Sequence, residues 1–429
     1  MLKTVWNSEA IGKFVFVSFL LFFLISGLIR NKQKSDFLDY YHASQRWETE
    51  ENLYKFDTVT KLAEKLKDWQ EIFLPENASL LDSLQNQTGT YIYPPLFSFL
   101  LIPLGHLDPI FASGLHSVLN WFCLVGIFFI LSKVRFFETG SKPGIWIFVL
   151  AILANFRYLE NHIQNNQVGL LLVFLVLSSL VSKNNFVSGI LLALATVIKV
   201  TPIVFIVIFL YEKRFKAVLY FLAGLVFWNA VPLLYRFDYT MEMTKEWFTQ
   251  VLGQALSNPL ARSWKNNQSL SSTLAKYFFQ GADFVNQPLY RLPFVSLSLS
   301  TIKIIQTCVI FIFGLPILYL LKKPNLKWNI TAILFLASCL FSGISWIHSF
   351  VICIFPICFL ILHNRNYLWS RYEKNWFWIT IALVLLTHRS FVGGLVENIL
   401  LMYSILFYLG ISLYMFIINI SLRNYESRD

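Results

Sequence analysis

The sequence has little charge and few cysteines for a chain of its length. Only 14% of its 429 residues are Asp, Glu, Lys or Arg, whereas soluble globular domains carry about 25%. This composition argues against a soluble enzyme. The aromatic content of 17% argues against a disordered chain, because disordered segments contain few aromatic residues.

Motifs for nucleotide and metal binding are also lacking. The chain contains no Walker A sequence, no Gly-x-Gly-x-x-Gly, no His-Glu-x-x-His and no Cys-x-x-Cys. Their absence argues against ATP-driven transport and against a soluble domain that binds a nucleotide sugar. All five cysteines lie in apolar runs, so we expect small buried side chains and predict neither disulfides nor a metal site. They are Cys123, Cys308, Cys339, Cys353 and Cys358.

Apolar residues make up 56% of the chain and are grouped in runs separated by charged residues. Twelve helical spans of about 20 residues would use about 240 positions, which is close to that fraction. We therefore predict an all-α fold, in which residues 1–429 form one integral-membrane domain, a polytopic bundle of about 12 spans. The first run, 14–29, has no small-residue cleavage site and is expected to be an anchor. Two long polar stretches, 31–92 and 236–298, are expected to hold amphipathic or juxtamembrane helices.

The distribution of basic residues predicts the orientation. Successive loops of a membrane bundle lie on alternate sides of the membrane. Seventeen of the 35 Lys and Arg residues lie at the termini and in the short loops that this alternation places on one side. The short loops on the other side hold only Arg157, Lys199 and Arg389. Because basic residues collect on the cytoplasmic side, we predict cytoplasmic termini and place both long loops outside the cytoplasmic membrane. The same rule accounts for the net charge of +11 without a nucleic-acid partner.

This orientation requires that the apolar run 94–105 does not cross the membrane. The run is bounded by Pro94-Pro95 and Pro109 and is too short for a helical span. A re-entrant segment is therefore expected there.

Given this orientation, the unusual polar residues gather on the outer side. Polar residues that lie partly at membrane depth indicate a functional site by default, and the cytoplasmic loops contain only ordinary basic residues. The outer positions are Asp36, Asp39, Asn161, His162, Gln164, Asn165, Asn166, Gln167, Lys199, Asn266, Asn267, Gln268, Ser269, Ser345, Trp346 and His348.

Asp36 begins a segment in which Asp36, Tyr40, Ala43 and Trp47 share one face of a short outer helix. It has two interpretations. It is either a general base at the membrane interface or the N-cap of that helix, with Asp39 favoured in the first turn by the helix dipole.

Lys199 lies between two apolar runs, one residue before Thr201-Pro202. A lysine at membrane depth is costly unless it is paired. We therefore expect either an anion such as a phosphate or a nearby carboxylate beside it. His348 lies at the boundary of a span, where both an interface role and a catalytic role fit. Tyr93-Pro94-Pro95 is a turn signal that starts or ends a helix.

Seven short motifs occur in order along the chain. They are Asp36-Phe37-x-x-Tyr40-Tyr41-x-Ala43, Leu53-Tyr54, Tyr93-Pro94-Pro95-Leu96 with Pro103-Leu104, Asn166-Gln167, Ile198-Lys199-x-x-Pro202, Asn267-Gln268-Ser269-Leu270 and Ser345-Trp346-x-His348. Their order, over about residues 33–350, resembles glycosyltransferase family 87, a family of membrane glycosyltransferases of the GT-C class. Two motifs depart from the family pattern. Its Gly-Gln-x-Asn is here Asn166-Gln167-Val168-Gly169, and its Ser-Trp-x-His-His is Ser345-Trp346-Ile347-His348-Ser349.

The resemblance implies a polyprenyl-phosphate-linked sugar donor, typically of mannose, and transfer at the outer face to a lipid-linked or glycan acceptor. It also implies that Asp36 is the catalytic aspartate, which suits a general base. Lys199 and His348 are candidates to stabilise the leaving phosphate. No cofactor is predicted, and a divalent metal is not required because a lysine neutralises part of the charge of a monophosphate. Candidates to hold the sugars are Tyr40, Tyr93, Gln167, Asn267 and Trp346.

Two other classes of protein stay open. A secondary transporter would place ionisable residues near the membrane midplane, often in internal repeats, whereas the polar residues here gather at one face. A polysaccharide polymerase or ligase would also act on lipid-linked glycans from outside. Such an enzyme would use a lipid-pyrophosphate donor and would lack the Asp-Phe-x-x-Tyr-Tyr opening.

Overall fold

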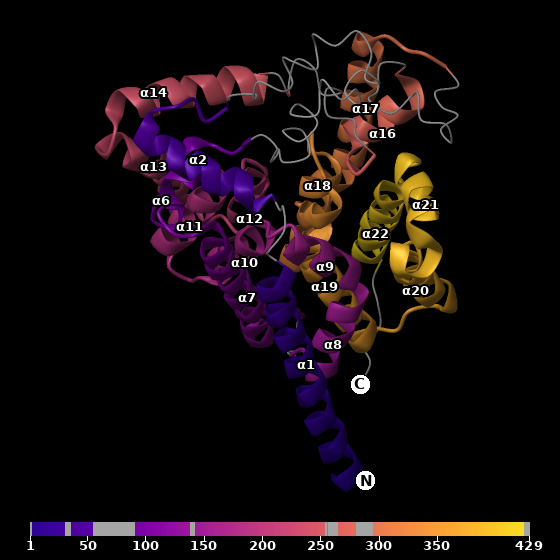
Figure 1. Cartoon of the computed structure of the whole chain (residues 1–429). Helices are drawn as coiled ribbons and strands as arrows, with labels where there is room; N and C mark the ends of the chain where they lie inside the picture. Colours follow the sequence, from indigo (N-terminus) through magenta and orange to yellow (C-terminus); the bar gives the residue numbers. More distant parts are fainter. Residues whose placement is uncertain are drawn as a thin grey trace.

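The computed structural model describes residues 2–30, 36–54, 91–137, 142–253, 255, 265–279 and 295–423, with the side chains of 2–8 and 30 left out. Within these ranges the regular secondary structure is entirely helical and no strand is found, so the all-α prediction is confirmed. The helices form one bundle, and the N-terminal helix α1 (Leu2–Arg30) extends beyond it at the end where the C-terminus also lies (Figure 1).

Six helical segments in the described part of the chain are long and apolar enough to cross a membrane. They are Glu9–Ile29 in α1, α7 (Pro109–Lys133), Phe215–Leu234 in α13 and η4, α17 (Leu299–Leu320), Ile347–Asn366 in η6 and α19, and α22 (Ile405–Leu422). Two bent pairs raise this number to eight at most: α9 (Phe156–Gln164) with α10 (Gly169–Val181), bent by 117°, and α20 (Arg371–Leu386) with α21 (Arg389–Met402), bent by 85°.

The predicted number of about 12 spans is therefore not confirmed. Several apolar runs that we counted as spans form helices too short to cross alone, because a span needs about 20 residues. These shorter helices are α8 (Ile145–Ala154), α11 (Asn185–Ile198), η3 with α12 (Thr201–Tyr211) and α18 (Lys327–Leu340). The segment predicted not to cross forms only two short helices, α5 (Pro95–Leu100) and α6 (Ile102–Gly105).

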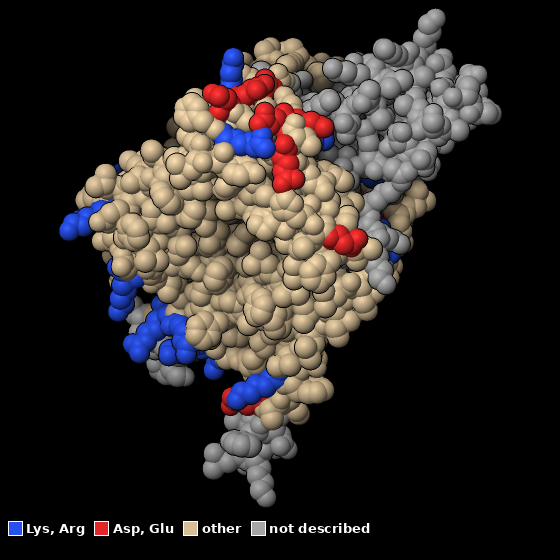
Figure 2. All heavy atoms as spheres, turned by 60° about the vertical axis from the view of Figure 1, so that its left-hand side comes forward, with Lys and Arg blue, Asp and Glu red and all other residues tan. Residues whose placement is uncertain are grey.

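A wide band across one face of the molecule carries few charged side chains (Figure 2). Figure 2 shows that most Asp and Glu side chains on the visible face gather at its upper end, and that Lys and Arg side chains dominate its lower end. Large apolar side chains are exposed on many helices, and α17 has only 6% of its most apolar window buried inside the protein. An apolar belt of this kind is what a helical bundle presents to lipid.

Close helix packing depends on glycine where α11 meets α13 (Phe215–Ala230). A Cβ atom on Gly189 would lie 2.6 Å from the backbone nitrogen of Phe221, and one on Gly224 would lie 2.7 Å from Cβ of Ala193. Small residues at both positions let the two backbones approach, as is typical of helix pairs in membranes.

Amphipathic helices occur in both long polar stretches, as predicted. The first stretch contains α2 (Phe37–Thr49), and the second contains α14 (Phe237–Glu246), η5 (Trp247–Gly253) and α16 (Leu270–Phe278). On α2 the side chains of Tyr40, Ala43 and Trp47, which were predicted to share a face, are all buried. Trp47 donates a hydrogen bond from its indole nitrogen to the hydroxyl of Ser98 at 2.9 Å, which fixes α2 on α5. Residues 55–90 of the first stretch lie outside the described residues.

Two of the three basic residues predicted on the outer side bind one buried carboxylate. Arg157 of α9 and Arg389 of α21 contact the two oxygens of Glu397 at 2.9 and 2.8 Å. Arg157 also donates to the hydroxyl of Thr387 at 2.7 Å. This ion network ties the bent pair α20–α21 to α9, the helix that leads into the candidate site.

The five cysteines are free, and four of them are buried as expected. The expectation fails at Cys308, which is exposed because it lies on the sparsely covered helix α17.

Candidate active site

Asp36 precedes the first residue of α2, but its side chain does not cap that helix. Its carboxylate instead accepts a hydrogen bond from the side-chain amide of Gln167. Gln167 lies in the break between α9 and α10, where the chain turns by 117°. The N-cap interpretation of Asp36 therefore does not account for its side chain, which is directed to a distant residue.

Two tyrosines fix the orientation of the Gln167 amide. Tyr40 donates its hydroxyl hydrogen to Oε1 of Gln167 at 2.6 Å, and the hydroxyl of Tyr93 lies 3.3 Å from the same oxygen. Because Oε1 accepts these hydrogen bonds, the NH₂ group of the amide faces Asp36. Both tyrosines are buried, and their hydroxyls lie 3.1 Å apart.

A buried polar network holds the turn that presents Gln167. Asn166 adopts a left-handed conformation with φ 47°. Its side chain donates to the carbonyl of Ser113 at 2.9 Å and accepts from Asn120 at 3.1 Å. Asn120 also donates to the backbone carbonyl of Gln167 at 2.8 Å. Both asparagines are buried, so α7 determines where the turn between α9 and α10 lies.

Asp36 lies on a polar cavity. Residues with amide, phenol or indole groups make up half of its lining, a composition suited to sugar hydroxyls. The polar and aromatic lining residues are Asp36, Asp39, Tyr40, Tyr93, Asn161, Asn165, Gln167, Lys199, Asn266, Trp346 and His348.

The surroundings of Asp36 make it a stronger base than an exposed aspartate. The protein around the carboxylate excludes much of the water and raises its pKa above the ordinary value of 3.8, while the hydrogen bond from Gln167 opposes part of that rise. The side chain is still 43% exposed toward the cavity, and Nδ1 of His348 lies 3.9 Å from Oδ2 of Asp36. A substrate hydroxyl therefore has access to the carboxylate.

Lys199 reaches the same cavity from the break between α11 and η3. Its ammonium lies 5.9 Å from the ring centroid of Tyr93. In the ranges that the structure describes, no carboxylate lies within ion-pair distance of Lys199, so the expected carboxylate partner is not found there. The other expectation, an anionic ligand, is consistent with this arrangement.

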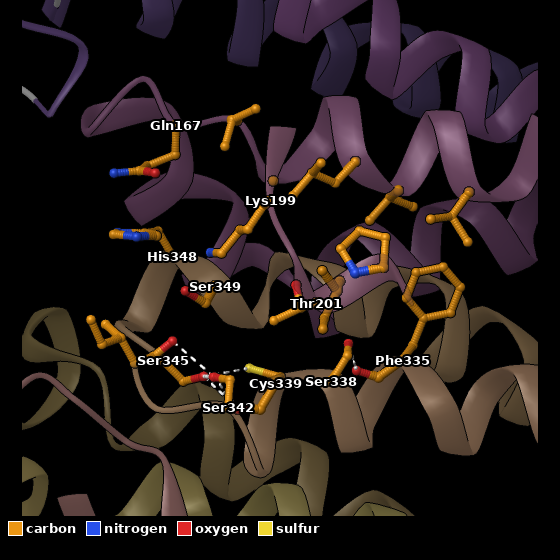
Figure 3. A pocket seen from close by; sticks show the side chains of 18 of the residues that line it. Gln167, Lys199, Thr201, Phe335, Ser338, Cys339, Ser342, Ser345, His348 and Ser349 are labelled. Carbon is orange, nitrogen blue, oxygen red and sulfur yellow. Dashed lines mark hydrogen bonds between the residues drawn. The ribbon is translucent and has the colours of Figure 1, made fainter. Parts of the chain in front are cut away.

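A second, narrower cavity adjoins the first. The two share Gln167, Lys199, Ile344 and His348 in their walls. The second cavity continues inward between apolar side chains such as Val176, and it also contains several hydroxyl groups (Figure 3). Lys199 and His348 therefore lie between a polar cavity and a partly apolar one.

The sequence profile of glycosyltransferase family 87 matches residues 91–343, more than half of the chain. The chain belongs to glycosyltransferase family 87. No curated protein matches it. The protein is therefore a membrane glycosyltransferase. The matched range includes Gln167 and Lys199 but ends before His348 and begins after Asp36, and only the fold brings these four residues to one cavity.

Most of the residues that the motifs of family 87 indicated lie together on the polar cavity. Asp36, Tyr40, Tyr93, Gln167, Lys199, Trp346 and His348 all line it. Asn267 is not among the described residues that line it, whereas its neighbour Asn266 is.

The side chain of Asn267 instead forms hydrogen bonds to backbone groups of the segment 343–345. Its Oδ1 accepts from the backbone nitrogen of Ser345 at 2.9 Å, and its Nδ2 donates to the carbonyl of Gly343 at 3.2 Å. Asn267 therefore positions the segment that leads to Trp346 and His348.

Three residues near the site were not predicted from the sequence. Lys276 of α16 is fully buried and donates to the carbonyls of Lys265, Asn267 and Leu401, so it anchors the second polar stretch against α21. The other two are Thr201 and Ser349, which line the second cavity. Thr201 stood within a family motif, but a hydroxyl between apolar residues gives no functional signal by itself.

Among the described residues, no three His, Cys, Asp or Glu side chains are placed to hold a metal ion.

Proposed function

We propose that this member of family 87 transfers a hexose, with mannose as the first candidate, from a polyprenyl-phosphate donor to a lipid-linked or glycan acceptor. In this proposal the reaction takes place at the outer face of the cytoplasmic membrane, and Asp36 is the general base. The observation that carries the proposal is one cavity that contains both a carboxylate with a raised pKa and the unpaired ammonium of Lys199.

The proposed chemistry is an inverting substitution. Asp36 takes the proton of an acceptor hydroxyl while that oxygen forms a bond to the anomeric carbon of the donor. The bond between the anomeric carbon and the phosphate oxygen breaks, and the lipid phosphate leaves with the bonding electrons. Lys199 and His348 stabilise the charge on the leaving oxygen.

The shape of the site supports a donor that is attached to a lipid. The polar cavity has amide and aromatic groups for sugars, and the adjoining cavity has apolar walls that include Leu172, Val176 and Phe205. A molecule with a sugar at one end and a prenyl chain at the other matches both. A monophosphate also matches the single unpaired cation found in the described part of the site, whereas a pyrophosphate carries more negative charge.

The test is transfer of radiolabel from polyprenyl-phosphate mannose to lipid or glycan acceptors in membranes that contain the protein. We expect Asp36→Asn to abolish transfer and Asp39→Asn to retain it. Asp39 is the matched control because it lies one helical turn further along α2 and lines the same cavity. Full transfer by a folded Asp36→Asn protein would refute the proposed base. A lipid-pyrophosphate glycan that serves as donor in place of the monophosphate would favour the polymerase or ligase alternative.

A further inference from the structure

Three hydrogen-bond donors at the outer end of the second cavity have no acceptor in the described protein. They are the ammonium of Lys199 and the hydroxyls of Thr201 and Ser349. The hydroxyl of Ser349 is buried without a hydrogen-bond partner. A buried donor that is left unpaired costs free energy. The ammonium of Lys199 and the hydroxyl of Thr201 line the same cavity as Ser349, so the three donors together point to a bound ligand that accepts hydrogen bonds.

The remaining hydroxyls of this cavity are different, because each already donates to a backbone carbonyl. Ser338 donates to Phe335 at 2.8 Å, Ser342 to Ile344 at 2.9 Å and Ser345 to Cys339 at 2.5 Å. The unpaired donors are therefore confined to one end of the cavity, next to the polar cavity that contains Asp36.

Two separate backbone segments supply the three donors. The chain leaves α11 at Lys199 in an extended conformation (φ −150°, ψ 129°) and re-enters a helix at Thr201, so Lys199 and Thr201 come from one wall. Ser349 comes from the other wall, in η6 (Ile347–Cys353). Figure 3 shows Lys199 and Ser349 entering the cavity from these opposite sides.

We propose that Thr201 and Ser349, together with Lys199, form the cradle that binds the phosphate oxygens of the lipid donor. This inference rests on the proposed function and adds two binding residues to it. An oxyanion with several acceptor oxygens satisfies one cationic and two neutral donors at once. The apolar wall beside the cradle, with Leu172 and Val176, favours a lipid phosphate over free phosphate.

Binding of short-chain probes to the purified full-length protein tests the cradle without any acceptor. The probes are citronellyl phosphate, citronellol and inorganic phosphate, and the readout is the dissociation constant measured by ligand-dependent thermal unfolding. We expect the wild-type protein to bind citronellyl phosphate at least about tenfold more tightly than the other two probes. Thr201→Val and Ser349→Ala should each weaken that binding by about tenfold, because each removes a hydrogen bond to a charged group.

Two variants control for structural damage. Ser338→Ala removes a hydroxyl that is engaged with Phe335 and should bind citronellyl phosphate within about twofold of wild type. Thr201→Ser keeps the hydroxyl and should also bind like wild type. If Thr201→Ser is as weak as Thr201→Val, the methyl group and not the hydroxyl matters, and the cradle is refuted at that position.

The remaining outcomes separate this inference from the proposed function. If Thr201→Val and Ser349→Ala bind like wild type while Lys199→Met loses binding, the hydroxyl cradle is wrong and the lipid-phosphate donor stands. If the wild-type protein binds citronellol as tightly as citronellyl phosphate, the phosphate is not recognised, and both the cradle and the proposed lipid-phosphate donor are wrong. Equal binding of inorganic and citronellyl phosphate would refute the lipid as the source of the phosphate.

Discussion

Gln167 donates a hydrogen bond from its side-chain amide to the carboxylate of Asp36, although 131 residues separate them in the sequence. The contact joins the first amphipathic helix to the break between α9 and α10. It has two effects on the proposed base. It directs the carboxylate into the polar cavity, and it favours the ionised form of Asp36 against the burial that raises its pKa.

Replacing Gln167 by Ala should therefore change the pH dependence of transfer as well as its rate. Without the amide, burial acts unopposed, so the pKa of Asp36 should rise and the acid limb of the pH–rate profile should move to higher pH. The loss of orientation should lower kcat/KM by about 10- to 100-fold. Gln164→Ala is the control, because Gln164 is an exposed residue of α9 that donates a hydrogen bond to Glu160 and does not line either cavity as described. A normal acid limb in Gln167→Ala would contradict the role of this hydrogen bond.

The wild-type enzyme should lose activity in acid at a pH above the ordinary aspartate value of 3.8. A general base works only when it is deprotonated, and the pKa of Asp36 is raised, so activity falls as the pH decreases through that raised pKa. The measurement is kcat/KM for the donor as a function of pH, under conditions where the protein stays folded. A rate that stays constant down to pH 3.8 would show that Asp36 does not act as the base.

The sequence predicts the positions of the helices in this protein better than it predicts the contacts between them. Apolar runs correctly locate many of the helices, and Tyr40 and Trp47, which spacing places on one face of α2, are both buried there. Helix length is predicted less well, because Pro202 and the polar break before it divide an apolar stretch into pieces too short to span. The predicted number of about 12 spans is therefore not confirmed in the described part of the chain.

Contacts between distant residues lie beyond such reasoning. The spacing of Asp36 fits an N-cap, and only the fold shows that its partner is Gln167. Neighbouring amides are equally ambiguous: Asn267 matches the family motif, yet Asn266 lines the cavity and Asn267 bonds to backbone. Which of two adjacent side chains faces a cavity depends on a local backbone rotation that the sequence does not reveal.

The turn beneath the site should tolerate Asn166→Gly better than Asn166→Ala. Asn166 has φ 47°, a conformation that glycine adopts freely and alanine adopts at a cost of about 1 kcal/mol. Both variants lose the hydrogen bonds to Ser113 and Asn120, so their difference isolates the backbone. Thermal unfolding of the purified variants should place Asn166→Ala below Asn166→Gly. Equal stabilities would show that the left-handed conformation is not maintained in the protein.

Glu397 should contribute more to stability than any exposed acidic residue. Its side chain is 2% exposed and pairs with Arg157, whose side chain is 1% exposed. Glu397→Ala leaves that guanidinium buried without its partner and should destabilise the protein by about 3–5 kcal/mol. The control is Glu9→Ala, which breaks an exposed i,i+4 pair with Lys13 and should cost about 0–1 kcal/mol. The double variant Arg157→Met/Glu397→Leu should recover much of the loss, since it removes both buried charges. A Glu397→Ala protein as stable as Glu9→Ala would contradict this account.

The predicted orientation can be tested by cysteine labelling in intact cells with a membrane-impermeant thiol reagent. A cysteine at position 142, in a loop predicted to be cytoplasmic, should stay unlabelled until the cells are permeabilised. A cysteine at position 164, at the end of α9 next to the polar cavity, should react from outside. The parent protein is the control, because its five native cysteines are free and Cys308 is exposed on α17. Labelling of position 142 from outside would reverse the orientation and move the proposed site to the cytoplasmic face. The polyprenyl-phosphate donor would then have to present its sugar on that side of the membrane.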